Sequence, residues 1–451
     1  MIPTLPAPGC DDPCNPGPGC PLPPPECGGG SGETLDKKKP AGKITVWDSN
    51  LGMEVPVKRT RVVARRWFKI DVVYTNDQGE FKCNKRFVNK VNILVKFLNN
   101  NITIHGLRTA RLWQMWFPIK KGIGIYSGNL SNISYRFNQN TLEPHSRTNR
   151  NWWAAQTMNS QVEFNEMAAA NNIGGLPSFM RILLTGWANA RGAGSAPMNG
   201  HRNPQIVPPL WINYFVLNPA HTGFASTLNW LYNGILIRKT DMTIGYDKNL
   251  KSDQVKALIY HEMSHAAHYN KVGDNWWNEL VNAETYEITR FGLNGAQSPY
   301  GIGDDGEMSG RIALAESWAE HIGRVMTDTK YGTTSSAQYN QGEIYVNNSP
   351  VMGLSSHLNL LEDFDPSRTG DPFKWIPQGL YYDIIDNRND LTVPSPRVLI
   401  NDQVDGYTNL QFFDALDNDI LTLPAYRDRL LQESGNNQGA QVINLFAAYG
   451  Y

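Results

Sequence analysis

The sequence predicts a multidomain protein in which an all-β part is followed by an α+β part. A chain of 451 residues is long enough to form more than one core. Between residues 43 and 104, apolar and polar residues alternate with a period of two, which is typical of half-buried strands. From residue 252 onward, apolar residues recur at helical spacing. We therefore expect strands to dominate the first third of the chain and helices to enter later.

The first 41 residues differ in composition from the rest of the chain. The first 30 residues hold ten of the 28 prolines and four of the five cysteines. We therefore expect residues 1–41 to form an extended tether that ends in a flexible Gly-Gly-Gly-Ser-Gly joint. Its cysteines have two interpretations, disulfide pairing in an oxidising compartment or lipid attachment at Cys10, where Leu-Pro-Ala-Pro-Gly-Cys vaguely resembles a bacterial lipobox. The four cysteines are Cys10, Cys14, Cys20 and Cys27.

Residues 42–130 are predicted to form a β-sandwich. The alternation is unbroken over residues 91–97, and residues 62–64 and 71–75 are rich in β-branched side chains. Residues 76–79, Asn-Asp-Gln-Gly, are typical of a turn. Short strands separated by frequent turns favour two small packed sheets over a helical domain.

Two segments in this region carry a family resemblance. They are GKITVWDSNLGMEVPVKRTRVVARRW, residues 42–67, and VVYTNDQGEFKC, residues 72–83. Together they resemble the carboxypeptidase-regulatory-like sandwich, in which a first strand, a strand containing Pro-Val and a T-x-D-x-G-x-F hairpin follow in this order. The resemblance implies an accessory, non-catalytic module with an Ig/transthyretin-like fold. Cys83 is then expected to be a small buried hydrophobic residue.

Residues 131–451 are predicted to form the second domain. In it we expect a short helix at residues 162–170 and short strands at residues 181–184, 211–217 and 242–246. Residues 240–247 directly precede the most informative helix.

That helix begins at Ser252, a residue that favours the N-cap position. His261 and His265 are four residues apart on it, so both imidazoles project from one face and can bind the same metal ion. Glu262 lies beside them and can accept a proton from water activated by the metal. This is the H-E-x-x-H pattern, and it predicts a catalytic zinc site with Glu262 as general base.

A catalytic zinc site needs a third protein ligand. A metzincin would supply a histidine at the position of Lys271, so that class is excluded. Residues 311–323 predict a second helix with Glu316 and Glu320 on one face. The chain thus resembles the gluzincin metallopeptidases, and the resemblance implies Glu316 as the third ligand and Glu320 as the acid that orients a ligating histidine. Glu284 is the competing third ligand, at nearly the spacing of thermolysin. Residues 240–247 lie where zincins place the edge strand that pairs with an extended substrate, so the resemblance implies an edge strand there.

Further residues near the motif have weaker roles. His268 is expected to be an outer-sphere or surface residue, because it projects from a different part of the helix. His321 is expected to be an exposed histidine at the helix end, with donation to an oxyanion as the alternative. A Tyr or His that stabilises the oxyanion is expected, and the candidates are His357, Tyr381, Tyr382 and Tyr286.

The combined expectation is a zinc metallopeptidase of zincin-like fold that hydrolyses peptide bonds in peptides or proteins. No cysteine follows Cys83, so histidine and carboxylate alone would hold the zinc. Two alternatives remain: a catalytically inactive zincin scaffold that binds a glycan or a protein in the cell envelope, and a peptidase selective for glycoproteins.

Composition limits the partners and the location. Lys and Arg number 41 against 42 Asp and Glu, a formal net charge of −1, so nucleic-acid partners are not expected. No apolar stretch approaches the roughly 20 residues that cross a bilayer, so no transmembrane segment is expected. No basic and apolar leader precedes the tether, so we expect no intact signal peptide in this sequence. The tether, sandwich and peptidase in series suggest an extracellular or cell-envelope protein, with a surface lipoprotein as one form.

Overall fold

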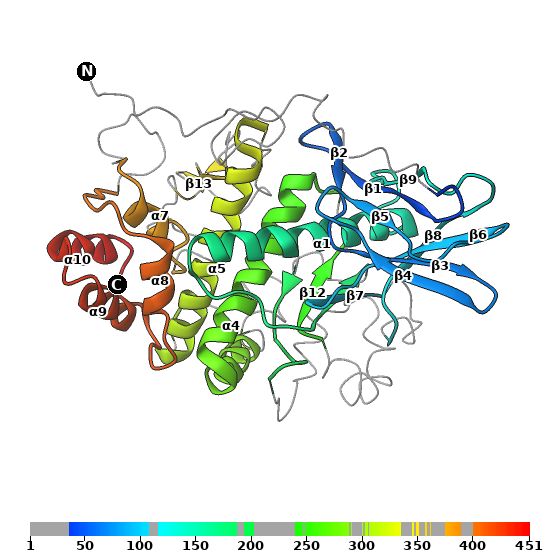
Figure 1. The fold of residues 1–451 in the computed structure, drawn as a ribbon. Coiled ribbons are helices and arrows are strands. Elements are labelled where there is room, and N and C mark those ends of the chain that lie inside the picture. The colour runs from blue at the N-terminus through cyan, green and yellow to red at the C-terminus, as the bar shows by residue number, and fades with distance from the viewer. Residues whose placement is uncertain are drawn as a thin grey trace, which may run out of the picture.

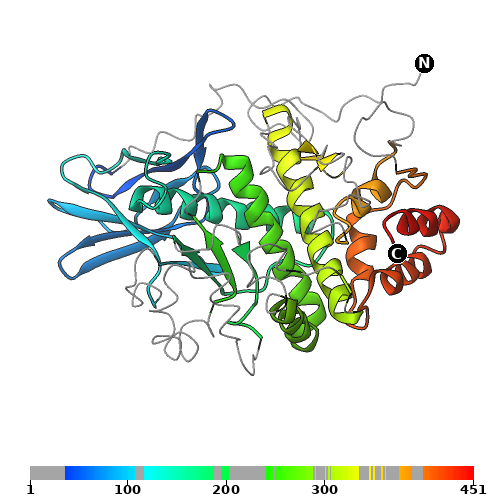
Figure 2. The same cartoon turned by 180° about the vertical axis from the view of Figure 1, so that it is seen from behind.

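The computed structural model places a strand-rich N-terminal region ahead of a largely helical region (Figures 1 and 2). The described residues are 36–107, 116–186, 194–202, 240–246, 249–287, 290, 300, 303–304, 306–334, 345–346, 349–350, 357–358, 361, 375–388 and 400–451. Most of the predicted tether, its four cysteines and the strand predicted at 211–217 lie outside them. No helix among the described residues is long and apolar enough to cross a membrane.

Eight strands of the N-terminal region form two sheets. The first contains β1 (Ala41–Asp48), β2 (Met53–Pro56), β5 (Glu80–Lys82) and β9 (Ile133–Phe137). The second contains β4 (Lys69–Tyr74), β3 (Arg61–Arg66), β6 (Val91–Lys96) and β8 (Lys120–Tyr126), in that order. Alternate side chains of both sheets are buried in one hydrophobic cluster, which explains the period of two in the sequence. Cys83 is buried, as predicted.

A third sheet lies between the N-terminal sheets and the helices. Its order is β11 (Gly194–Ser195), β12 (Met242–Gly245), β10 (Met180–Thr185) and β7 (Ile102–Leu107). β7 precedes the predicted boundary at residue 130 but pairs with β10, whereas β9 follows that boundary but pairs with β1. Each region therefore contains a strand that lies on the other side of residue 130 in the sequence.

The expectation that the strand at 240–247 forms the sheet edge is wrong. β12 pairs with β10 on one side and with β11 on the other, and all four of its residues are buried. Among the described strands of this sheet, β11 takes the outer place instead. Two residues are too few to show any periodicity, so the sequence could not reveal this strand.

Helix α1 (Arg147–Ala170) is much longer than the helix predicted at residues 162–170. The hydroxyl of Ser146 caps its first turn by accepting a hydrogen bond from the backbone N–H of Asn149. Residues 151–162 are buried all around the helix, including polar side chains such as Gln156. A helix buried on every side has no apolar stripe, so its first half gives no helical pattern in the sequence.

The two longest helices carry the metal motif. They are α4 (Ser252–Glu287), which is kinked at Gly273, and α5 (Glu307–Tyr331), which is followed by a short 3-10 turn at Gly332–Thr334. Beyond them lie the strand pair β13 (Tyr345–Val346) and β14 (Ser349–Pro350) and the helices α7 (Leu380–Ile385), α8 (Asn409–Ala415), α9 (Leu423–Glu433) and α10 (Gly439–Ala448).

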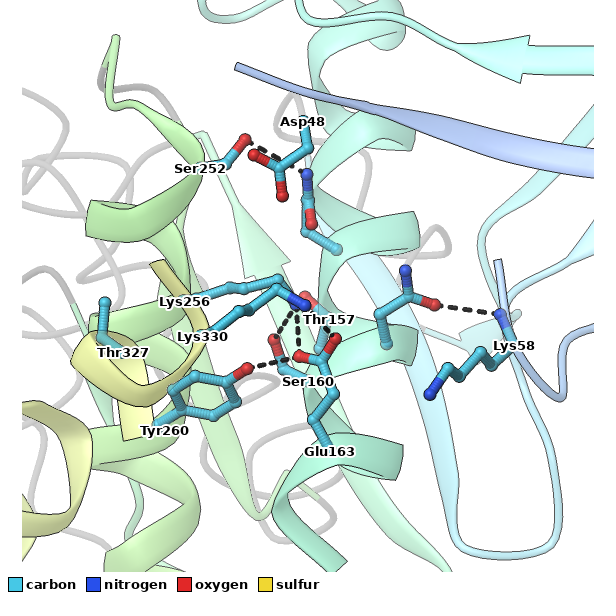
Figure 3. A network of polar contacts seen from close by, with 12 residues as sticks. Asp48, Lys58, Thr157, Ser160, Glu163, Ser252, Lys256, Tyr260, Thr327 and Lys330 are labelled. Atoms are coloured by element: carbon cyan, nitrogen blue, oxygen red, sulfur yellow. Dashed lines mark hydrogen bonds and ion pairs between the residues drawn. The ribbon is translucent and has the colours of Figure 1, made fainter. Parts of the chain in front are cut away.

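A largely buried cluster of charged side chains connects helices α1, α4 and α5 (Figure 3). Glu163 of α1 accepts hydrogen bonds from Lys256 of α4 and Lys330 of α5, each at 2.6 Å, and from the hydroxyl of Tyr260. Burial alone would raise the pKa of Glu163, but the two ammonium groups lower it to about 2. Because Tyr260 directly precedes His261, this cluster fixes the helix turn that presents the first ligand.

Candidate metal centre

Close packing of α4 against α5 brings the candidate ligands together. Gly323 of α5 faces the start of the motif, and a Cβ atom there would lie only 3.1 Å from the carbonyl oxygen of Ala257 and 3.2 Å from the backbone nitrogen of His261. A larger residue at 323 would therefore push the two helices apart. Glu320 and Glu316 lie about one and two turns earlier on α5, within reach of the histidines.

His261, His265 and Glu316 form a group that can hold a metal ion. The Nε2 atoms of the two histidines are 3.1 Å apart. His261 Nε2 lies 3.2 Å from one carboxylate oxygen of Glu316, and His265 Nε2 lies 3.4 Å from the other. All three residues are largely buried, so their ligand atoms converge in a place shielded from bulk water.

The spacing of these groups is compatible with one shared ion. Zinc bonds of about 2.0–2.1 Å at tetrahedral angles place two ligand atoms about 3.3 Å apart. The separations are 3.1 Å between the two histidine nitrogens and 3.2 and 3.4 Å from these nitrogens to the two different oxygens of Glu316, and one ligand atom from each residue lies within 4.8 Å of the others. Two imidazoles and one carboxylate are also a donor set that zinc prefers in catalytic sites. The residues therefore fit a zinc ion in both geometry and chemistry.

Glu320 takes the outer position that the resemblance implied. Its carboxylate lies 3.3 Å from His261 Nδ1, so that nitrogen donates to Glu320 while Nε2 faces Glu316. Burial alone would raise the pKa of Glu320, but Arg324 and His261 lower it to about 2. Arg324 in turn donates to His357 Nδ1 at 3.0 Å, and His357 Nε2 donates to Asp253 at 3.3 Å. A chain of charged and polar groups thus fixes the tautomer of His261.

Replacing Glu320 with Gln should weaken zinc binding by about 10- to 100-fold, because an uncharged group holds the His261 ring less firmly. Competition with a chromophoric chelator measures this affinity. Glu307→Gln removes an exposed carboxylate from the first turn of the same helix and is the matched control. Equal affinities for the two variants would contradict the role of Glu320.

Glu262 is buried directly beside the ligand group. A Cβ atom at Gly194 would lie 2.4 Å from its Oε1, so only glycine lets strand β11 approach this carboxylate. Its Oε2 is buried without a hydrogen-bond partner among the described residues. Burial raises the pKa of Glu262 to about 8, and the charges of Glu316 and Glu284 add to this effect against the opposing influence of His261.

A small pocket opens between Glu262 and strand β11. Its volume is about 20 Å³, enough for one water molecule. The lining residues are Gly194, Ser195, Ala196, Glu262, His265, Trp277, Leu280, Val281, Glu284, Tyr300 and Glu316. The site thus combines three ligand groups, a buried carboxylate and a strand that is outermost among the described strands of its sheet.

Tyr300 is the pocket residue that sequence reasoning missed. It is hydrogen-bonded to Glu316 and lies near Glu284 and Glu262. Burial and these three carboxylates raise its pKa well above the ordinary value, so the hydroxyl keeps its proton and can donate it. A single tyrosine has no spacing or periodicity that would distinguish it in the sequence.

The structure separates the two candidates for the third ligand. Glu316 belongs to the converging group, whereas Glu284 lines the pocket and is not part of that group. Arg202 lies close enough for an electrostatic interaction with Glu284. Glu284 therefore lies at the pocket beside the ligand group.

His321 is not an exposed residue at a helix end, contrary to expectation, and of the two positions expected for His268 the surface one is wrong. His268 is buried against Trp276 and Trp277, with ring centroids 4.7 and 5.5 Å away, and burial lowers its pKa to about 3. His321 is fully buried and its Nε2 lies 2.9 Å from the side-chain oxygen of Asn409. Both are core residues: His268 packs against the part of α4 that follows its kink at Gly273, and His321 packs against α7 and α8.

The four candidates for the oxyanion donor do not line the pocket. His357 interacts with Arg324 and Asp253, and Tyr381 is buried among aromatic rings that include His321. Tyr286 is exposed and stacks on Arg290. Tyr382 lies on α7 and is not among the lining residues. Tyr300 lines the pocket instead.

Comparisons with known proteins provide little further information. No protein-family description and no curated protein matches the chain. A 9R-lipoxygenase from Cyanothece is a distant structural neighbour, with 12% sequence identity and a TM-score of 0.13. The match covers 30% of this chain and 25% of the lipoxygenase, so it spans only a quarter of that protein.

Proposed function

We propose that this protein is a zinc metallopeptidase that hydrolyses peptide bonds, with an N-terminal β-sandwich and a zincin-like catalytic part. The observation that carries the proposal is the convergence of His261, His265 and Glu316 beside the unpartnered carboxylate oxygen of Glu262. A secreted or cell-envelope location remains part of the proposal.

The roles of the residues follow from their positions. When bound by His261, His265 and Glu316, zinc would supply a Lewis acid that polarises a substrate carbonyl and makes water more acidic. Glu262 would accept the proton of the attacking water and deliver it to the leaving amine. Its free oxygen faces the pocket beside the ligand group, which is the place where this transfer is needed.

The substrate would lie along strand β11. The outer position of β11 among the described strands leaves its backbone groups available to pair with an extended peptide. Gly194 and Ser195 of this strand also line the pocket. Tyr300, protonated at neutral pH, would donate a hydrogen bond to the oxygen that becomes negative when water attacks.

A comparison of two glutamate variants tests the proposal. Glu316→Gln should lose bound zinc and peptide cleavage together, because it removes a negatively charged ligand. Glu284→Gln should keep close to one zinc per chain, because Glu284 is outside the ligand group. Metal content is measured by mass spectrometry on the purified full chain, and cleavage on a broad peptide library.

The outcomes distinguish this activity from the alternatives. A zinc-loaded wild-type chain that cleaves no peptide would contradict a general peptidase. Cleavage of a mucin but not of its deglycosylated form would identify a glycoprotein-selective peptidase. Binding of a glycan or protein without any hydrolysis would instead identify an inactive scaffold. Zinc loss in Glu284→Gln but not in Glu316→Gln would overturn the ligand assignment.

A further inference from the structure

The positive charges of this protein are concentrated in its strand-rich region. Residues 36–137 contain 20 Lys and Arg but only 6 Asp and Glu, a formal net charge of +14. The whole chain carries −1, so the remaining residues together carry −15. The near-neutral net charge of the whole chain therefore conceals a basic region, residues 36–137, and an acidic remainder, which we call the acidic body. The basic region can attract an anionic partner that the acidic body repels.

In the sheet formed by β4, β3, β6 and β8, several Lys and Arg residues lie directly opposite one another on neighbouring strands. Arg61 of β3 is opposite Lys96 of β6, and Lys96 is opposite Lys120 of β8. At the other end of the sheet, Arg66 of β3 is opposite Lys69 of β4. Like charges in directly opposed positions destabilise a sheet unless an anion neutralises them.

These cations have no acidic partner within the part of the chain that the structure describes. None of the five forms an ion pair there. Four other Lys and Arg residues of the same region do pair with carboxylates, namely Lys58, Arg59, Arg86 and Arg136. The Nε atom of Arg61 is buried without a hydrogen-bond partner. The cations are therefore available to an external anion.

The turn between β3 and β4 presents two large apolar side chains. Trp67 is 81% exposed and Phe68 is 98% exposed. The hairpin that carries them projects from the end of the molecule farthest from α9 and α10 (Figures 1 and 2). A row of opposed residues crosses the sheet next to this turn. It contains Ile70 of β4, Arg65 of β3 and Ile125 of β8, and both isoleucines are exposed. The β3–β4 turn thus presents exposed apolar side chains, with Lys and Arg side chains beside them.

We propose that the β3–β4 hairpin and the outer face of its sheet dock on an anionic lipid surface. Phe68 has no polar atom and Trp67 has an amphipathic ring, so both gain by entering the interface between headgroups and acyl chains. Arg65, Arg66 and Lys69 then lie at the level of the lipid phosphates, where each cation strengthens binding. A polyanionic sugar or nucleic acid would use the cations but would leave Phe68 in water. The inference does not depend on the proposed peptidase activity.

Vesicle sedimentation with the full chain tests this docking. The probes are vesicles of phosphatidylcholine alone and of phosphatidylcholine with phosphatidylglycerol, each at low and high salt. We expect binding to the anionic vesicles only, weakened by salt. Trp67→Ser/Phe68→Ser should reduce the affinity at least about tenfold, because it removes the inserted apolar surface. Arg66→Ser/Lys69→Ser should reduce it by about 10- to 30-fold.

Matched double variants in the acidic body serve as controls. Leu142→Ser/Phe179→Ser removes two exposed apolar side chains, and Arg181→Ser/Lys251→Ser removes two exposed cations. Neither control should change vesicle affinity, and zinc content should be the same in all variants. Equal binding by Trp67→Ser/Phe68→Ser and its control would overturn the proposal. Failure to bind anionic vesicles, with retention on heparin or DNA, would identify a polyanion as the partner instead and would equally overturn it.

Discussion

Glu262→Gln should lower kcat/KM for peptide hydrolysis by about 100- to 10,000-fold, the range that a positioned general base contributes. Glutamine matches the shape of the native side chain and still fits beside Gly194, but its amide cannot take a proton from water. The three ligand residues are untouched, so zinc content should remain the same. Steady-state cleavage of one selected peptide, together with metal analysis, measures both quantities.

The control for this experiment is Glu279→Gln, which makes the same change at an exposed position of the same helix. It should retain wild-type activity. If Glu262→Gln kept full activity with zinc bound, another group would have to act as the base, and the proposed mechanism would fail. A loss of zinc together with activity would show that Glu262 supports the metal site rather than the proton transfer.

The part of the site that lies on single helices was predictable from the sequence. His261 and His265 are one helical turn apart, so their spacing alone determines that they share a face. Glu316 and Glu320 are likewise one turn apart on α5. The choice between Glu316 and Glu284 depended on how α5 packs against α4, and Gly323 allows the approach that brings Glu316 to the histidines.

The parts that were missed come from short or fully buried segments. Strand β11 has only two residues and Tyr300 stands alone, so neither gives a periodic signal. The first half of α1 is buried on all sides and shows no amphipathic stripe. The pairing of β9 with β1 and of β7 with β10 depends on contacts between distant segments, which the order of strands along the chain does not specify.

Glu163→Gln should lower the free energy of unfolding by about 3–5 kcal/mol, because it leaves buried Lys256 without its compensating charge. The carboxylate pKa is depressed to about 2 in the folded chain from an ordinary value of 4.5. Its contribution is therefore present above pH 4.5 and is lost as the pH falls towards 2. The stability of the wild type should decrease over this acidic range, and the variant should lack that part of the pH dependence. Urea unfolding at a series of pH values measures both effects.

Two further variants identify the cause. Glu166→Gln lies on the same helix and removes exposed ion pairs to Lys58 and Arg59, so it should cost less than about 1 kcal/mol. Glu163→Leu/Lys256→Met removes the buried pair together and should recover most of the loss, since well-packed apolar side chains can replace a buried ion pair. If the double variant were no more stable than Glu163→Gln, the loss would come from packing around α1 and not from an unpaired charge. Tyr260 of this cluster directly precedes His261 in the sequence and donates to Glu163 (Figure 3). Zinc affinity should therefore fall in Glu163→Gln and not in Glu166→Gln. This result would connect the buried charges to the geometry of the metal centre.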